Sequence, residues 1–310
     1  MPVTPSVRLF AATLILLGLL GALLGLQPLE DGERVVSPPS QAVARSPTPA
    51  APKQHGSQRP QTVPADVAVE NARRYARARP GVVSFAVVNT RGRLRGELAH
   101  RRHSSASVVK SLLLAAELRR LERNEVALDA TTQSLLRAMI VYSDNDAADA
   151  IYGRVGDPGL IDVARSSGME RFTVAGHWGN AQITAGDMAR MFSDLESVYA
   201  GPQQEFALGL LGSIVPEQRW GIPAAAPQRW AVRFKGGWVT TDHGQITHQA
   251  AELRDSDRLL SMAILTDEQP SMAVGTETVR GVADRLLEPP DRSKRASSSR
   301  PGQPAARRGS

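Results

Sequence analysis

The residues best suited to chemistry in this chain are Ser107 and Lys110, three positions apart in the run from His103 to Leu118. Small, hydroxyl-bearing residues come first and leucines at helical spacing follow, which predicts a loop that leads into a helix. Residues three apart on a helix share a face, so the lysine amine is expected beside the serine hydroxyl. Burial would lower the pKa of that amine, and the neutral amine could then accept the serine proton.

Lysine usage supports this interpretation. Of the 37 basic residues, only four are lysines, namely Lys53, Lys110, Lys235 and Lys294. Arginine supplies the remaining positive charge, and a guanidinium differs from an amine chiefly because it does not lose its proton. Lys110 and Lys235, the two lysines outside the polar ends, therefore indicate positions where an amine is needed.

Two further motifs follow Ser107 in the chain: Ser143-Asp144-Asn145, and Lys235-Gly236-Gly237 with Trp238 directly after it. The order S-x-x-K, S-D-N, K-[TS]-G is that of class A β-lactamases and penicillin-binding proteins, with a glycine here in the middle of the third motif. Over about residues 64 to 288, the sequence resembles a divergent member of this serine hydrolase superfamily. The segment 183–190 is similar to the threonine-led helix start that follows the omega loop in class A enzymes.

The resemblance implies roles for the motif residues. Ser107 would attack a carbonyl carbon with Lys110 as its base, Ser143 would pass a proton to the leaving amine, and Lys235 would bring positive charge toward the substrate. The substrate-binding residues would be Asn145, Gly236, Gly237 and Trp238. The amides of Ser107 and Gly237 are the expected oxyanion donors. The implied partner is a β-lactam or a peptidoglycan-type peptide, without a metal or a cofactor.

Two departures from the family pattern bear on activity. Gly236 lacks the hydroxyl that helps to hold a substrate carboxylate in the family, although Thr240 or Thr241 could fold back to supply one. Class A enzymes also use an omega-loop glutamate to activate water, but Glu170 is the only acid between positions 168 and 184 and lacks the E-x-x-x-N pattern. We therefore expect slow hydrolysis of an acyl-enzyme.

The surrounding pattern predicts the elements that position these motifs. A helix is expected from about residue 64 to 80, a hairpin over 82–100 and mostly helical structure over 128–215. Three strands at 230–239, 246–253 and 259–266 precede a closing helix at 274–287. Strands at both ends with helices between them indicate an α+β fold, in which terminal helices flank an antiparallel sheet of about five strands and a helical lobe is inserted. The motifs would meet between the sheet and the lobe.

The segments outside this domain have their own signatures. Residues 1–8 are expected to be a cytoplasmic N-terminus, and residues 9–28 form an apolar stretch, which is either an uncleaved transmembrane anchor or a cleaved signal peptide. Residues 29–63 are a Pro/Ser-rich linker, 64–288 the hydrolase domain, and 289–310 a disordered basic tail. The chain is therefore expected at the cell membrane with an extracytoplasmic domain, or secreted if the leader is cut. Its formal charge of +6 could suggest nucleic acid, but an exported chain meets none.

Other residues carry weaker signals. Cysteine is absent, which excludes disulfides and a thiol nucleophile. His177 is more consistent with a solvent-facing loop histidine than with a base. His243 and His248 lack acidic or thiol partners in sequence, which argues against a metal site. Three tryptophans are expected in the core or the wall of the groove: Trp220, Trp230 and Trp238.

Two classes of function remain open from the sequence. The first is an extracytoplasmic serine acyltransferase or hydrolase that acts on a β-lactam or peptide amide. The second is a degenerate relative that keeps the fold and binds wall peptide or a protein partner without turnover. The two retained lysines favour the first, whereas Gly236 and the missing omega-loop glutamate favour the second.

Overall fold

The computed structural model describes residues 66–88, 93–256 and 258–288. All of them belong to one unit of the chain, residues 56–310. The apolar stretch at 9–28, the linker at 29–63 and the tail at 289–310 lie outside the described residues, so their predicted roles stay predictions. In the part of the chain that is described, no helix has the length and apolar character needed to cross a membrane.

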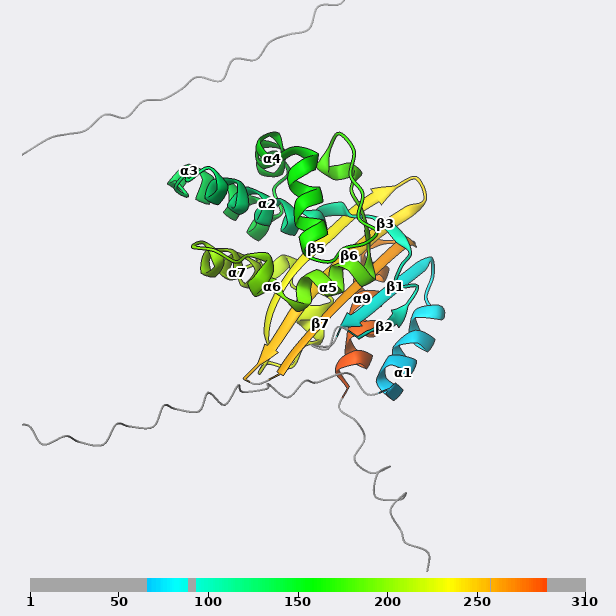
Figure 1. Cartoon of the computed structure of the whole chain (residues 1–310). Helices are drawn as coiled ribbons and strands as arrows, with labels where there is room; N and C mark the ends of the chain where they lie inside the picture. Colours follow the sequence, from blue (N-terminus) through cyan, green and yellow to red (C-terminus); the bar gives the residue numbers. More distant parts are fainter. Residues whose placement is uncertain (1–65, 89–92, 257, 289–310) are drawn as a thin grey trace, which may run out of the picture. The chain divides into compact units, whose positions relative to one another are not determined.

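A five-stranded antiparallel sheet forms the centre of the domain (Figure 1). Its strand order is β2 (Leu94–Glu97), β1 (Val82–Val88), β7 (Arg258–Gln269), β6 (Gly244–Asp255) and β5 (Ala231–Thr241). The first two strands of the chain thus pair with the last three, which places β5 and its Lys235 motif at one edge. The α+β fold predicted from the sequence is confirmed.

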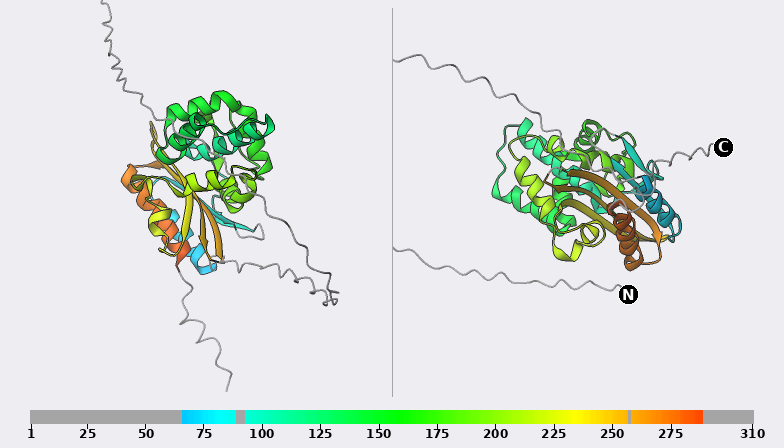
Figure 2. Two further views of the ribbon diagram at one scale, coloured as in Figure 1. Left: turned by 90° about the vertical axis from the view of Figure 1, so that its left-hand side faces the viewer. Right: turned by 90° about the horizontal axis from the view of Figure 1, so that it is seen from below.

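Helices cover both faces of the sheet, and strand alternation explains why. In β1, Phe85 and Val87 pack into a cluster with α1 (Asp66–Arg77) and α9 (Met272–Leu287). Ala86 and Val88 pack on the opposite face with the helical lobe. The view from below in Figure 2 shows the sheet between these two layers.

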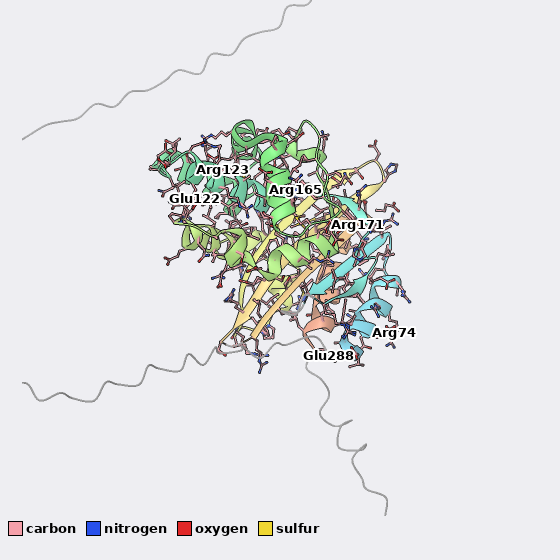
Figure 3. The ribbon with its side chains drawn as sticks, in the orientation of Figure 1. Arg74, Glu122, Arg123, Arg165, Arg171 and Glu288 are labelled. Atoms are coloured by element: carbon pink, nitrogen blue, oxygen red, sulfur yellow. The ribbon has the colours of Figure 1, made fainter. Side chains whose placement is uncertain are left out.

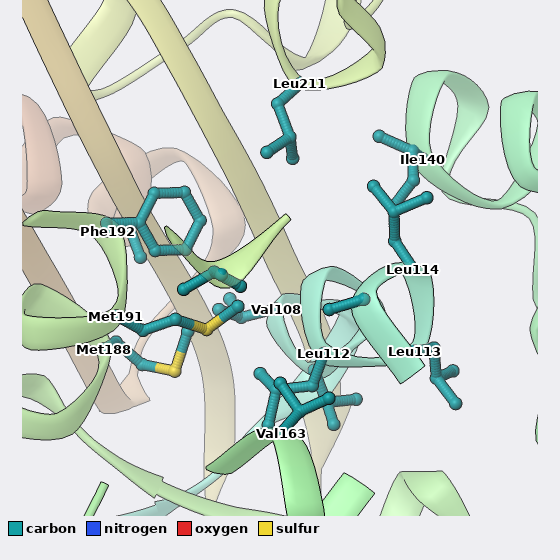
Figure 4. Packing of buried hydrophobic residues seen from close by; sticks show 14 of the residues in the cluster. Val108, Leu112, Leu113, Leu114, Ile140, Val163, Met188, Met191, Phe192 and Leu211 are labelled. Atoms are coloured by element: carbon teal, nitrogen blue, oxygen red, sulfur yellow. The ribbon is translucent and has the colours of Figure 1, made fainter. Parts of the chain in front are cut away.

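The helical lobe is inserted between β2 and β5. Its main helices are α2 (Lys110–Arg123), α3 (Ala130–Arg137), α4 (Asn145–Ser166), α5 (Ala185–Ser193), α6 (Leu195–Val198) and α7 (Gln204–Gly212). Helix α2 is buried in its middle, and its leucines pack against side chains of neighbouring elements (Figure 4). Charged residues such as Arg74, Arg123 and Arg165 are exposed on the helices instead (Figure 3).

The structure departs from the predicted elements in two places. The second strand of the hairpin ends at Glu97 instead of His100, because Leu98 has a φ of 46°, outside the extended region. A small second sheet pairs β3 (Arg102–Ser104) with β4 (Gln182–Thr184). Strands of three residues are too short to show an alternation in sequence, so the pattern did not reveal them.

Candidate active site

Ser107 lies in a 3-10 turn, η1 (Ala106–Val109), that runs directly into α2 at Lys110. The Lys110 amide donates to the Ser107 carbonyl, so both residues belong to one continuous helical turn. Ala106, just before the serine, has a φ of 43°. This left-handed conformation is energetically unfavourable for any residue other than glycine. Such a conformation persists only where surrounding contacts hold it.

The Lys110 side chain is fully buried and points at the second motif. Its Nζ donates to the Ser143 carbonyl at 2.6 Å and to Asn145 Oδ1 at 2.7 Å. The Ser107 hydroxyl makes no hydrogen bond to a described residue. The sequence placed the Lys110 amine beside this hydroxyl, but in the structure the two groups are not hydrogen-bonded to each other. The half-buried hydroxyl is free to meet a substrate carbonyl, one turn away from the amine.

Trp178 forms the apolar wall over this amine. The Lys110 Nζ lies 5.0 Å from the centre of the indole ring. Asp149 Oδ1, on α4, accepts from Trp178 Nε1 at 2.6 Å and from His177 Nε2 at 3.1 Å. His177 Nδ1 accepts from the Gly179 amide at 3.0 Å, so both ring nitrogens are occupied and neither can act as a base. The imidazole is about half exposed, as the loop interpretation expected.

Burial sets the proton affinity of Lys110. Desolvation lowers its pKa from 10.5 to about 8, while the carboxylates of Asp144 and Asp149 oppose this shift. At pH 7, a minor fraction of the amine, about one tenth, is therefore neutral and able to accept a proton.

Ser143 is presented by a strained turn between two helices. It follows a π-helical turn, η2 (Ala138–Tyr142), and has a φ of 63° and a ψ of 32°. The Asp144 side chain then caps α4 by accepting from the Ala147 amide at 2.7 Å. Ser143-Asp144-Asn145 is thus a capped turn between two helices, and the same turn aims Ser143 and Asn145 at the two lysines.

Lys235 reaches Ser143 from the opposite side. Its Nζ donates to Ser143 Oγ at 3.0 Å and to the Gly236 carbonyl at 2.8 Å. The side chain is fully buried, and burial, followed by repulsion from Lys110, holds its pKa well below the ordinary value. Two buried amines therefore converge on one serine, one at its carbonyl and one at its hydroxyl.

The third motif packs tightly on the nucleophile turn. A Cβ built on Gly237 would lie 2.7 Å from the Ser107 amide nitrogen and 2.9 Å from that of Val108, so only glycine allows this approach. A Cβ on Gly236 would instead meet the Trp220 ring at 3.5 Å, an ordinary contact. Trp220 packs edge-on against Trp238, which is 37% exposed at the end of the motif.

The hydroxyls proposed to replace the missing one at position 236 are engaged elsewhere. Thr240 Oγ1 donates to Gln245 Oε1 at 2.9 Å, and Thr241 Oγ1 donates to the Gly244 carbonyl at 2.9 Å. Both therefore belong to the β5–β6 hairpin. The expectation that one of them folds back beside Gly236 is wrong for this structure.

Glu170 makes no side-chain hydrogen bond to a described residue of the site. Its side chain is exposed, and its backbone amide is held by Asp187 Oδ1 at 3.0 Å. The adjacent Arg171 amide is held by Asp187 Oδ2 at 3.1 Å, which ties this segment to α5. The group next to the Lys110 amine from this loop is the indole of Trp178, which cannot take a proton from water.

Sequence comparison assigns the family. The sequence profile of the beta-lactamase enzyme family matches residues 129–288, which is 160 of the 310 residues (288 − 129 + 1). The chain belongs to this family. The match includes Ser143 and Lys235 and begins after Ser107. A comparison with curated proteins finds no match.

Solved structures of beta-lactamases share the fold of this family member. Three of them have 20% sequence identity to the chain: a beta-lactamase from Sphaerobacter thermophilus, a class A beta-lactamase from Mycobacterium abscessus and a beta-lactamase from Burkholderia vietnamiensis. Their TM-scores are 0.63, 0.62 and 0.63 in that order. The alignments cover 71%, 75% and 76% of this chain and 95%, 100% and 98% of the known chains.

The structure joins four of the polar residues singled out in the sequence by hydrogen bonds, with Ser107 one helical turn away, but the motifs did not reveal the wall around them: the four are Lys110, Ser143, Asn145 and Lys235. Trp178 and Asp149 come from a loop and a helix that the motifs do not include. One signal was present, because Asn145 and Asp149 are four apart on a helix and therefore lie on the same face. The three tryptophan positions expected from the sequence agree with the structure: Trp230 is buried, and Trp220 and Trp238 are partly exposed and pack against each other.

Proposed function

We propose that this beta-lactamase family member is an extracytoplasmic serine hydrolase or acyltransferase, in which Ser107 is acylated by a β-lactam or a cell-wall peptide amide. The observation that carries the proposal is the convergence of two buried amines on Ser143, with one of them a single helical turn from Ser107. Burial of two lysines costs free energy, which a purely structural site would avoid with apolar residues.

The proton path follows from the contacts. Ser107 Oγ bonds to the substrate carbonyl carbon while its proton passes to the neutral Lys110 amine. When the carbon–nitrogen bond breaks, the Ser143 hydroxyl gives its proton to the leaving nitrogen. Lys235, bonded to that hydroxyl at 3.0 Å, is placed to restore the proton. The product is an ester on Ser107 and an amine, which leaves when the substrate is a peptide and stays attached to the acyl group when it is a β-lactam.

The carbonyl oxygen needs donors as negative charge develops on it. One is the Ser107 amide. We assign the second to the Trp238 amide instead of the Gly237 amide, because backbone groups of successive strand residues point to opposite edges. The Gly236 carbonyl binds the Lys235 amine beside Ser143, so it faces the free edge of β5, as does the backbone of Trp238 two residues later.

Deacylation is expected to be slow. Trp178 covers Lys110, the exposed Glu170 carboxylate makes no hydrogen bond to a described site residue, and both nitrogens of His177 are engaged. No residue of these three can activate water. An acyl-enzyme that persists is compatible with transfer of the acyl group to an amine as well as with slow hydrolysis.

A fluorescent penicillin tests the proposal on a denaturing gel. We expect the wild type to be labelled, and Ser107→Ala to remain unlabelled at equal loading. Lys110→Arg is the matched control for charge, because it keeps a cation at position 110 but cannot accept a proton. Equal labelling of all three proteins would disprove the proposal. The degenerate alternative, in which the fold only binds, requires an unlabelled wild type.

A further inference from the structure

A buried histidine pair lies behind the nucleophile turn and takes no part in the proton path. His103 on β3 and His248 on β6 are both buried, and their rings meet edge-on with centres 5.7 Å apart. His248 is the β6 partner of Gly237, the glycine that packs on the Ser107 amide. The pair therefore occupies the layer directly beneath the site.

The hydrogen-bond partners fix the tautomer of His248. Its Nδ1 accepts from the Thr266 amide at 3.1 Å, and an amide can only donate. The proton must then reside on Nε2, which lies 2.9 Å from the Ser104 carbonyl and donates to it. His248 thus joins strand β7 to the residue three positions before Ser107.

The segment between Ser104 and Ser107 needs such support. Ala106 has the left-handed φ of 43°, and Ser105 is bonded by its amide to the Ala181 carbonyl at 2.9 Å. Backbone strain next to a reactive group persists only when neighbouring contacts over-determine it. The imidazole of His248 is one such contact, because it holds the carbonyl immediately before Ser105.

His103 lies next to Ser104 in β3 and links this strand to β1. Its Nε2 lies 2.8 Å from Ser84 Oγ on β1, while its Nδ1 lies 3.9 Å from Asp267 Oδ2. Burial lowers the pKa of His248 from 6.5 to about 4, so its ring is neutral near pH 7 and keeps the tautomer that the contacts require. The sequence interpretation had weighed His248 only as a metal ligand together with His243, which is exposed in the β5–β6 hairpin.

We propose that His248 is a positioning residue for acylation, which holds the nucleophile turn in its strained conformation through the Ser104 carbonyl. The inference rests on the proposed function of Ser107. It predicts that loss of the Nε2 hydrogen bond impairs the acylation step itself and leaves the initial binding of the acyl donor unchanged.

Two substitutions separate the two hydrogen bonds of the ring. In His248→Gln the side-chain NH₂ takes the place of Nε2 and can still donate to Ser104. In His248→Asn the side-chain oxygen takes the place of Nδ1 and can still accept from Thr266, but the bond to Ser104 is lost. Acylation of the full chain by a penicillin is followed by intact mass at a series of concentrations, which yields the maximal rate constant and the dissociation constant of the initial complex.

We expect His248→Gln to acylate within about threefold of wild type, and His248→Asn to lose about 10- to 30-fold in the maximal rate constant with an unchanged dissociation constant. Thermal unfolding of both variants is the control for folding. Equal loss in the two variants, no loss in His248→Asn, or a loss confined to the dissociation constant would each overturn the inference. A wild type that never acylates would overturn the proposed function and this inference with it.

A measurement on the wild type covers the case in which His248→Asn does not fold. The ring carbon and nitrogen chemical shifts of His248 report its tautomer by nuclear magnetic resonance. The inference requires the Nε2-protonated form. The Nδ1-protonated form would leave the Ser104 carbonyl without its donor and would overturn it.

Discussion

The pH dependence of acylation should report the Lys110 amine. In the proposed path the neutral amine accepts the Ser107 proton, so the rate constant follows the neutral fraction. Burial lowers the Lys110 pKa from 10.5 to about 8. Since deprotonation creates the active form, acylation is expected to rise with pH and to level off above the pKa.

The expected magnitude follows from that shift. With a pKa of about 8, the neutral fraction rises from about 1% at pH 6 to about 9% at pH 7 and about 50% at pH 8. An exposed lysine would be only about 0.03% neutral at pH 7, so burial raises the neutral fraction about 300-fold. We therefore expect the acylation rate constant to increase about 50-fold between pH 6 and pH 8 and less than about threefold beyond it.

Stopped reactions analysed by intact mass measure this rate constant between pH 5.5 and pH 10. The matched variant is Lys110→Arg, which should acylate at least about 1,000-fold more slowly, with no inflection, because arginine stays charged. Trp178→Phe is a milder change that lets water closer to the amine and should move the inflection to higher pH. A wild-type rate that is independent of pH, or that keeps rising tenfold per unit through pH 10, would refute the assignment of Lys110 as the base.

Three further predictions concern Gly237, Gly236 and the buried His103. Gly237→Ala should lower stability by about 1–3 kcal/mol and slow acylation, because its Cβ would collide with the Ser107 amide nitrogen; an unchanged melting temperature with full labelling would contradict this packing. Gly236→Ser should raise the ratio of the acylation rate constant for a penicillin to that for its methyl ester, whereas Gly236→Ala should leave this ratio unchanged. Equal ratios in the two variants would argue against a carboxylate-binding role for a hydroxyl at this position. Burial, then the neighbouring His248 and Arg101, lower the His103 pKa from 6.5 to about 3. As the pH falls from 6.5 toward 3, the His103 imidazole is protonated in the unfolded state but not in the folded state, so the free energy of unfolding should decrease by up to about 1.4 kcal/mol per pH unit. Urea unfolding at several pH values measures this free energy. If wild type and His103→Gln lose the same free energy per pH unit, the prediction is wrong.

The local features of this protein were largely predictable from the sequence. Leucine spacing after Ser107 predicted a helix, and α2 begins at Lys110. Long strands near the C-terminus were visible as apolar runs, and they form β5, β6 and β7. These features depend on neighbours in sequence, which is why periodicity reveals them.

Contacts between distant segments were harder to predict. The 3-10 turn places Lys110 toward Ser143 and Asn145, 33 and 35 residues away, and not in a bond with Ser107. Trp178 covers the amine only because α4 and the loop after it fold back, which no short motif encodes. The role of His248 depends likewise on the three-residue strand β3, whose sequence has no detectable period.

The most direct test of the account is the mass of the full chain after incubation with a penicillin, followed by peptide mapping of any adduct. We predict a single covalent adduct on Ser107 that remains after the free penicillin is removed, and no adduct on Ser107→Ala. An unmodified wild type, or an adduct on any other residue, would contradict the claim that Ser107 is the nucleophile of this site.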